Sequence, residues 1–284
     1  RFAGDELPQG LVGTVVALAD KLETLVGMFG IGNLPTGDKD PFALRRHALG
    51  VIRMLVEKQL PLGLRDVLEA TYKSMDEALA DKGLVETVAA TDRAGEQVRL
   101  VKTTQRFLDA ETPDKVVDFI FERFAGSLRE QGYSSQEVDA ALASRPRYLS
   151  DIPKRLEAVR AFARLPEAPA LAAANKRIGN ILKKAEADEA VQAQVDGALL
   201  QEPAEQSLYA AMQQTVPQAD AQFDAGDYTA SLQTLARLRE PVDAFFDGVM
   251  VNAEDAALRR NRQGLLKTLH LAMNRVADLS RLAQ

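Results

Sequence analysis

The sequence predicts a mostly helical protein of two domains, and three observations lead to this prediction. Apolar residues recur at three- and four-residue steps along most of the 284-residue chain, which is the period of an amphipathic helix. The length corresponds to about two domains at roughly 100 to 200 residues each. Four prolines gather between residues 146 and 169, and proline disfavours helix in the residue before it. We therefore expect one domain over residues 1–150 and a second over residues 151–284.

In the first half, a helix is expected where apolar residues form one face: Leu11, Val15, Leu18, Leu22, Leu25 and Phe29. Pro41 suits the first turn of a helix over residues 42–59, and Thr112 with Pro113 suits the start of one over residues 114–131. Between these, residues 84–102 alternate in polarity around a turn-like segment and predict a small β-hairpin. A surface insertion without regular structure is the alternative.

In the second half, Ser134 or Ser135 and Asp227 have the residue types and positions of helix N-caps. On a helix through residues 175–184, Lys176, Asn180 and Lys183 or Lys184 share a face opposite Ile178, Ile181 and Leu182. A long C-terminal helix is expected to bury Leu258, Leu265, Leu266, Leu269 and Met273.

Composition excludes several classes of protein. Hydrophobic residues make up 46% and charged residues 27%, as in folded globular proteins rather than disordered chains. No apolar run approaches the roughly 20 residues of a membrane helix, so we expect no membrane association. The chain has no cysteine, which excludes disulfides and thiolate chemistry. It begins with Arg and without a secretory pattern, so we expect part of a longer, cytoplasmic protein.

The net charge of −6 conceals two basic segments around an acidic one. Residues 145–184 carry 10 basic and 3 acidic side chains, and residues 257–284 carry 6 and 1. Residues 185–256, between them, carry 2 basic and 14 acidic side chains. The overall acidity therefore does not exclude a nucleic-acid partner.

Few residues suggest catalysis or a metal. The only histidines, His47 and His270, fall on apolar-rich helices and are interpreted as structural. The Gly-rich loop over residues 29–41 lacks the P-loop order and flanks its lysine with two aspartates, so it is interpreted as an interhelical turn. Asp20 lies in an apolar run, where it either pairs locally or points into a site; we favour the structural interpretation. We therefore predict neither catalytic nor metal-binding residues in this chain.

The two basic segments allow RNA binding, because arginine suits both phosphates and base edges, while a solvated surface stays open as the alternative. We expect them to meet on one face of the second domain, with the acidic stretch between them turned away. The residues predicted to contact RNA are Arg145, Arg147, Lys154, Lys176, Arg177, Asn180, Lys183, Arg259, Arg260 and Arg262. No DNA partner is expected.

Five sequence blocks resemble a known family. They are ALADKLETLVG at 17–27, PTGDKDPFALRR at 35–46, ANKRIGNIL at 174–182, FFDGVMV at 245–251 and DAALR at 255–259. Together they resemble the beta subunits of the bacterial two-subunit glycyl-tRNA synthetase. The last three look like that family's DALR-type anticodon-binding domain, with one residue inserted in the DALR motif. Residues 82–104 carry no part of the resemblance.

The resemblance implies a division of labour between subunits. The alpha subunit would hold the aminoacylation centre and use ATP and Mg²⁺, and this chain would bind glycine tRNA and the alpha subunit without a cofactor of its own. Residues 1–150 would be the C-terminal remainder of an HD-like domain, in which Asp20 takes the position of the last metal-binding Asp. Two alternatives stay open: an assembly scaffold that docks the alpha subunit without touching RNA, and a degenerate HD-type metal phosphohydrolase.

Overall fold

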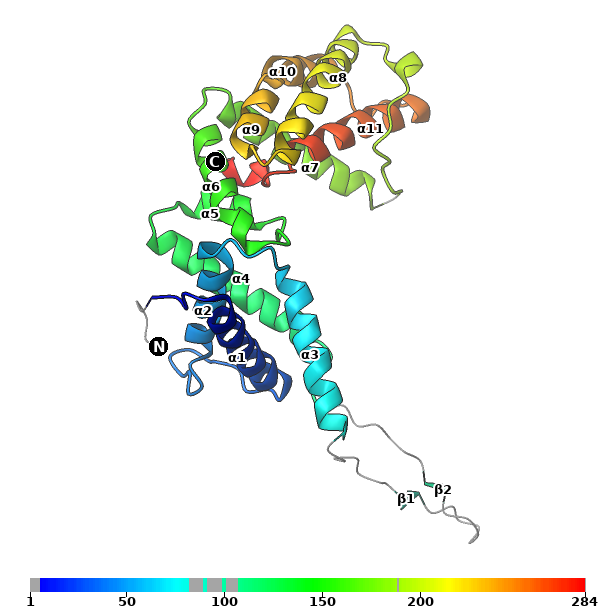
Figure 1. Cartoon of the computed structure of the whole chain (residues 1–284). Helices are drawn as coiled ribbons and strands as arrows, with labels where there is room; N and C mark the ends of the chain where they lie inside the picture. Colours follow the sequence, from blue (N-terminus) through cyan, green and yellow to red (C-terminus); the bar gives the residue numbers. More distant parts are fainter. Residues whose placement is uncertain (1–5, 82–88, 91–98, 101–106, 188, 284) are drawn as a thin grey trace. The chain divides into compact units, whose positions relative to one another are not determined.

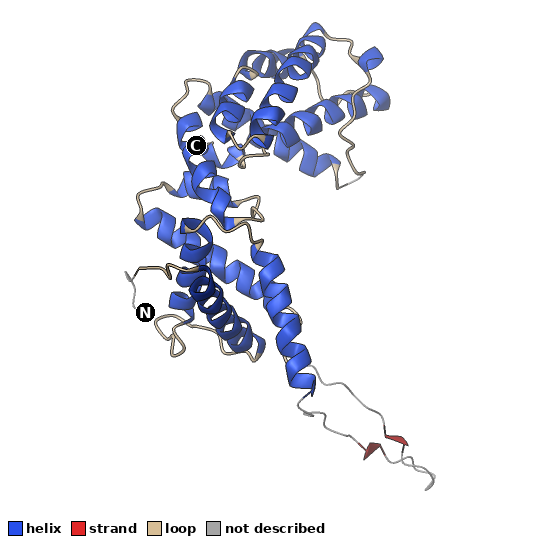
Figure 2. Ribbon diagram, viewed as in Figure 1, coloured by secondary structure: helices blue, strands red, loops and turns tan. Residues whose placement is uncertain are grey.

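The computed structural model of the protein describes residues 6–81, 89–90, 99–100, 107–187 and 189–283. Within these ranges the secondary structure is almost entirely helical, which confirms the predicted fold class (Figure 2). The chain divides into two compact units. The first unit comprises residues 1–127 and 147–150, and the second comprises residues 128–146 and 151–284. Residues 128–146 were expected in the first domain, which was predicted to end at residue 150, but they pack with the second unit.

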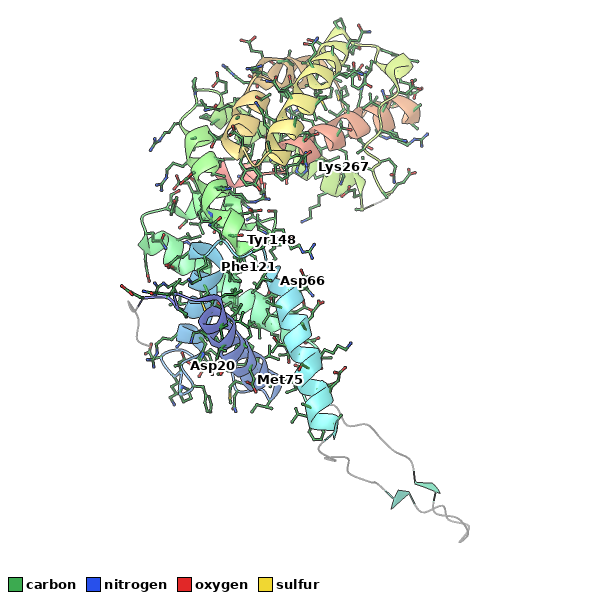
Figure 3. All side chains as sticks on the ribbon, in the orientation of Figure 1. Asp20, Asp66, Met75, Phe121, Tyr148 and Lys267 are labelled. Carbon is green, nitrogen blue, oxygen red and sulfur yellow. The ribbon has the colours of Figure 1, made fainter. Side chains whose placement is uncertain are left out.

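In its described residues the first unit contains α1 (Leu11–Gly30), α2 (Leu44–Glu57), α3 (Leu64–Asp81) and most of α4 (Thr112–Glu130), whose residues 128–130 are assigned to the second unit (Figure 1). Helix α1 packs against α2 and α3. Gly27 allows a close approach there, because a Cβ at this position would lie 3.1 Å from Cε of Met75 on α3 (Figure 3). The ring centroid of Phe29 on α1 lies 5.1 Å from that of Phe119 on α4, an aromatic contact between the two helices.

The start of α1 differs from the expectation. Leu18, Leu22, Leu25 and Phe29 are buried as predicted. The side chains before them are not: Leu11 is 75% exposed and Val15 is 56% exposed. Periodicity predicts the helix correctly, but it does not predict how far along the helix the neighbouring elements extend.

Helix α2 begins two residues later than predicted. The carboxylate of Asp40 accepts hydrogen bonds from the backbone N–H groups of Leu44 at 2.7 Å and Arg45 at 3.0 Å. Ala43, at the N-cap position, has a φ of 55°, so the chain turns sharply between Pro41 and the helix. Asp40 therefore provides hydrogen-bond acceptors for two of the unpaired N–H groups at the start of α2. Pro41 lies in the turn before the helix and not at its first position.

The predicted hairpin is represented by two short strands, β1 (Ala89–Ala90) and β2 (Arg99–Leu100). They pair antiparallel, with Ala89 opposite Leu100 and Ala90 opposite Arg99. The rest of the predicted hairpin, residues 84–88, 91–98 and 101–102, lies outside the described residues.

The second unit is an all-helical bundle. Its helices are α5 (Ser135–Leu142), α6 (Ile152–Ala163), α7 (Ala168–Ala185), α8 (Pro203–Asp224), α9 (Tyr228–Ala236), α10 (Arg239–Gly248) and α11 (Ala256–Met273). Short 3₁₀ helices η2 (Gly197–Leu199) and η3 (Leu279–Leu282) join or follow them, and η1 (Leu149–Asp151) contains the division between the units at residue 150. Helix α9 packs on α6 and α8, and α7 packs on α11 and η3. Phe162 and Phe245 are among the largest fully buried side chains of the core.

The predicted N-caps are confirmed. Ser134 accepts a hydrogen bond from the Glu137 N–H while the Glu137 carboxylate accepts one from the Ser134 N–H, which is a capping box at the start of α5. Asp227 accepts one from the Ala230 N–H at the start of α9. None of the described helices combines the length and apolar character needed to cross a membrane.

Glu137 also joins α5 to α6 through an ion pair. Arg160 donates from Nε to Glu137 Oε1 at 2.8 Å, and its guanidinium lies 4.1 Å over the Tyr133 ring. The hydrogen bond from Arg160, helped by those from Ser134, lowers the pKa of Glu137 from 4.5 to about 2. A carboxylate with a lowered folded-state pKa stabilises the fold above its unfolded pKa, and this contribution is lost as the pH falls through the folded value.

We therefore expect Glu137→Gln to lower the free energy of unfolding at pH 7 by about 1–2 kcal/mol, since it removes charge-assisted hydrogen bonds and half of a capping box. The deficit relative to the wild type should shrink between pH 4.5 and pH 2. Urea unfolding of both proteins across this pH range measures it. Glu157→Gln, an exposed position on α6, serves as control. Equal destabilisation by the two variants would contradict the role of Glu137.

Candidate functional site

A cleft of about 1140 Å³ in the second unit lies between segments that are distant in sequence. Its walls are α7, the segment over residues 189–199, which ends in η2, and the first half of α11. Five basic side chains line it: Lys176, Arg177, Lys184, Arg259 and Arg260. Two acidic side chains, Glu189 and Asp196, also line it. Some members of both basic segments therefore meet on one surface, but the expectation that the acidic stretch turns away is wrong, because its residues 189–199 line the same cleft.

Helix α7 supplies one wall through its exposed face. Lys176, Asn180 and Lys184 follow one another at steps of four residues and all line the cleft. Ile178 and Leu182, on the other side of the helix, are buried in the core. This placement settles the choice that the helical spacing had left open between Lys183 and Lys184.

Lys183, which was predicted to contact RNA, lies elsewhere. It borders a smaller cavity of about 330 Å³ together with Lys267 and His270. One residue along a helix is a rotation of about 100°, so neighbouring lysines face different surfaces. Burial lowers the pKa of His270, consistent with a structural histidine, as the sequence predicted.

Helix α11 supplies the opposite wall through its first turns. Asp255 caps it by accepting hydrogen bonds from the N–H groups of Ala257 at 2.7 Å and Leu258 at 3.0 Å. These backbone hydrogen bonds from Leu258 and Ala257 lower the pKa of Asp255. Arg259 donates back to the Ala253 carbonyl at 2.7 Å, whereas Arg260 is exposed. The helix start is thus fixed by its own residues, and Arg260 projects from a fixed base.

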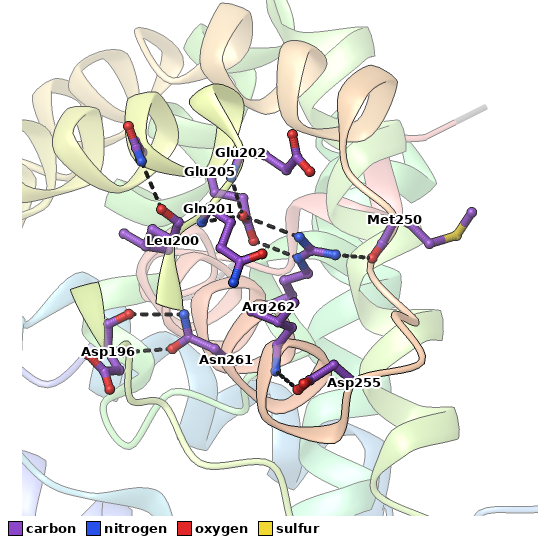
Figure 4. Close-up of polar contacts among 11 residues, drawn as sticks. Asp196, Leu200, Gln201, Glu202, Glu205, Met250, Asp255, Asn261 and Arg262 are labelled. Atoms are coloured by element: carbon purple, nitrogen blue, oxygen red, sulfur yellow. Dashed lines mark hydrogen bonds and ion pairs between the residues drawn. The ribbon is translucent and has the colours of Figure 1, made fainter. Parts of the chain in front are cut away.

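Arg262 is buried, against the expectation that it contacts RNA. Its side chain is 6% exposed, and Nε donates to Glu205 Oε1 at 2.6 Å (Figure 4). A second nitrogen of its guanidinium donates to the Met250 carbonyl at 2.8 Å. These contacts leave Arg262 inside the bundle, where it connects α11 to the start of α8 and to the loop after α10.

Glu205, the partner of Arg262, has a fully buried side chain. It also accepts hydrogen bonds from the N–H groups of Gln201 at 3.0 Å and Glu202 at 2.8 Å (Figure 4). Burial alone would raise the pKa of Glu205, but the hydrogen bonds from Arg262 and from the backbone outweigh it and leave the pKa below its ordinary value. Glu205 therefore stays ionised, and hydrogen bonds from two consecutive backbone N–H groups and from Arg262 hold it in place.

Asn261 and Gly264 hold the third wall of the cleft against α11. The Asn261 side chain accepts from the Asp196 N–H at 2.7 Å and donates to the Asp196 carbonyl at 3.1 Å (Figure 4). A Cβ at Gly264 would lie 2.1 Å from the Gln194 carbonyl oxygen, so only glycine allows this approach. The side chain of Asp196 itself accepts from the Ala198 N–H at 2.9 Å and begins η2.

The remaining predicted residues do not line the cleft. Arg145 and Lys154 are exposed elsewhere on the second unit. Arg147 belongs to the first unit, where it donates to Asp66 Oδ2 at 2.7 Å and lies 5.5 Å over the Tyr148 ring. Of the ten residues predicted from sequence, the cleft therefore gathers Lys176, Arg177, Asn180, Arg259 and Arg260.

The first unit offers little for metal chemistry. Asp20 is exposed on α1 (Figure 3). Burial is the main cause that lowers the pKa of His47, and the nearby Lys21 adds to it. Among the described side chains, no group of three or more His, Asp or Glu residues is placed to hold a metal ion.

Comparisons with known proteins match two regions of the chain. A family model described as glycyl-tRNA synthetase beta subunit matches residues 1–143, and one described as DALR anticodon binding domain matches residues 171–279. The glycine–tRNA ligase beta subunit of Delftia acidovorans is 65% identical over 283 residues, which are 100% of this chain and 36% of that protein. The corresponding protein of Dechloromonas aromatica is 61% identical over 286 residues, again 100% and 36%. The chain thus spans about a third of the length of these relatives.

We expect removal of either partner of the buried pair to destabilise the second unit by about 3–5 kcal/mol, because the remaining charge stays buried without compensation. Arg262→Ala and Glu205→Ala test this in urea unfolding. Arg239→Ala removes an exposed ion pair with Asp243 and should cost less than about 0.5 kcal/mol. If the buried and exposed variants lose similar stability, the pair does not hold the cleft together.

Proposed function

The chain belongs to the glycyl-tRNA synthetase beta subunit family, and on that premise we propose that it binds glycine tRNA through the cleft of its second unit. The observation that carries the proposal is the meeting of basic side chains from α7 and α11 in one cleft. Every residue that lines the cleft falls within the region that resembles an anticodon-binding domain. We therefore assign the anticodon stem and loop as the part of the tRNA that it holds.

The charge arrangement suits a nucleic-acid loop. A stem and loop carries phosphates on both sides of its unpaired bases, so a binding protein needs cations on more than one wall. Lys176 and Lys184 on α7 face the cleft from one helix, and Arg259 and Arg260 on α11 face it from another. Phosphate contacts position the RNA, and the polar groups between them, such as Asn180, are available for base edges.

The catalytic step is assigned to a different subunit. We infer that the alpha subunit joins glycine to tRNA with ATP and Mg²⁺ in the cytoplasm, and that this chain contributes binding energy and position. The Gly-rich loop before α2 fits this division, because Asp40 in the loop caps α2 and a carboxylate there repels a phosphate. The first unit, as an HD-like remainder, acts as a scaffold.

A scaffold without RNA contact is the second candidate, and one observation favours it. The start of α1 presents apolar side chains to solvent: Leu11, Val12, Val15 and Val16 are all more than half exposed. Such a patch is typical of a protein–protein contact. Ionic strength separates the candidates, because RNA binding weakens steeply with salt while an apolar interface does not.

We expect the wild-type chain to bind glycine tRNA more tightly than a non-cognate tRNA. Lys176→Gln and Arg260→Gln should each weaken this binding and reduce the slope of log K against log salt by about 1 for each phosphate that is no longer neutralised. Filter binding at several salt concentrations measures both. Arg237→Gln, an exposed arginine of the second unit outside the cleft, is the matched control. An equal effect of all three variants would refute the assignment of the cleft.

We also expect the chain by itself to show no glycine-dependent ATP–pyrophosphate exchange, because the activation step is assigned to the alpha subunit. The exchange assay is therefore made with this chain only, without added alpha subunit. Exchange above the background of a heat-denatured sample would overturn the division of labour.

A further inference from the structure

Three arginines of the second unit lie over an aromatic ring at nearly the same distance. The pairs, with the distance from the arginine Cζ to the ring centroid, are Arg160 over Tyr133 at 4.1 Å, Arg275 over Phe223 at 4.1 Å and Arg177 over Phe246 at 4.2 Å. All are within the roughly 6 Å that a cation–π contact requires.

Two of these arginines are neutralised by carboxylates. Arg160 is paired with Glu137, and Arg275 is paired with Asp220 and with Asp224. Among the described side chains, no carboxylate forms an ion pair with Arg177. Arg177 is also exposed and lines the cleft. Acidic side chains therefore neutralise two of the three arginines that lie over a ring. The third, Arg177, has no such ion pair within the described part of the chain and lines the cleft.

The ring beneath Arg177 is held firmly. Phe246 is half-buried on α10, and its ring meets that of Phe245 edge to face at 5.5 Å between centroids. Phe245 is fully buried in the core of the bundle. Helix α10 itself packs against α7, which carries Arg177. The Arg177 guanidinium thus lies over a ring that the core holds in place, and the exposed Arg177 side chain also lines the cleft.

An exposed planar guanidinium is a surface on which an unpaired nucleobase stacks. We propose that Arg177, supported by Phe246, is the stacking platform of the cleft and receives one unpaired base of an RNA loop. The proposal rests on the proposed function, since it names what one residue of that cleft does. Stacking needs the planar guanidinium of Arg177. A phosphate contact needs only a positive charge, which the neighbouring Lys176 would supply equally well.

The distinction predicts an unusual effect of a conservative substitution. Arg177→Lys keeps the charge but removes the plane, so it should weaken binding of a hairpin carrying the glycine anticodon loop by about tenfold while the salt slope stays unchanged. Phe246→Leu should weaken binding in the same direction. Thermal unfolding establishes that both variants are folded. Arg275→Lys, which changes an equally stacked but neutralised arginine, should leave binding unaffected.

Hairpins that lack one loop base at a time identify the stacked base. When the missing base is the one that stacks on Arg177, the wild-type chain should bind that hairpin about as weakly as Arg177→Lys binds the complete hairpin. With the shortened hairpin, Arg177→Lys should then cause no further loss of affinity. Wild-type affinity in Arg177→Lys, or an equal reduction with every hairpin, would overturn the stacking role. If Arg260→Gln still weakens binding in that case, only this inference fails. Failure of the wild-type chain to bind glycine tRNA or any hairpin would refute the proposed function as well.

Discussion

The buried ion pair between Glu205 and Arg262 is the contact on which the architecture of the second unit depends. Its 2.6 Å hydrogen bond joins α8 to α11 between two buried side chains. Such a pair is tolerated only when the remaining polar atoms are satisfied, and here the Gln201, Glu202 and Met250 backbones supply those partners. Two chain segments, residues 201–205 and the loop at Met250, are therefore fixed to one turn of α11, and the adjacent Asn261 fixes a third at Asp196.

Arginines that are nearly contiguous in sequence consequently have different roles. Arg259 braces the loop before α11, Arg260 projects into the cleft, and Arg262 neutralises a buried carboxylate. Successive side chains on a helix point about 100° apart. Within about one turn, Arg259 therefore contacts the loop at the helix start, Arg260 faces the cleft and Arg262 faces the core. These arginines form a single basic cluster in the sequence but not in the folded protein.

The DAALR block, which contributes to the family resemblance, is also a helix start. Asp255 satisfies two open N–H groups of α11, and Arg259 returns to the carbonyls of Ala253 and Glu254. An anionic residue at this end also interacts favourably with the helix dipole. The block thereby fixes the start of α11, from which Arg260 and Asn261 extend. Arg260 lies on the α11 wall of the cleft, and Asn261 holds the wall over residues 189–199, so this local cap positions both walls.

The sequence alone determined what depends on neighbours within a turn or two. It predicted the helical class, the caps at Ser134 and Asp227, and the polar face of α7, because periodicity and capping act over three or four residues. Only the tertiary structure decided that Arg262 is buried, that Lys184 rather than Lys183 joins the cleft, and that Leu11 is exposed. Whether a side chain is covered depends on which distant segment packs over it. Glu205 lies 57 residues from Arg262, and no local rule connects them.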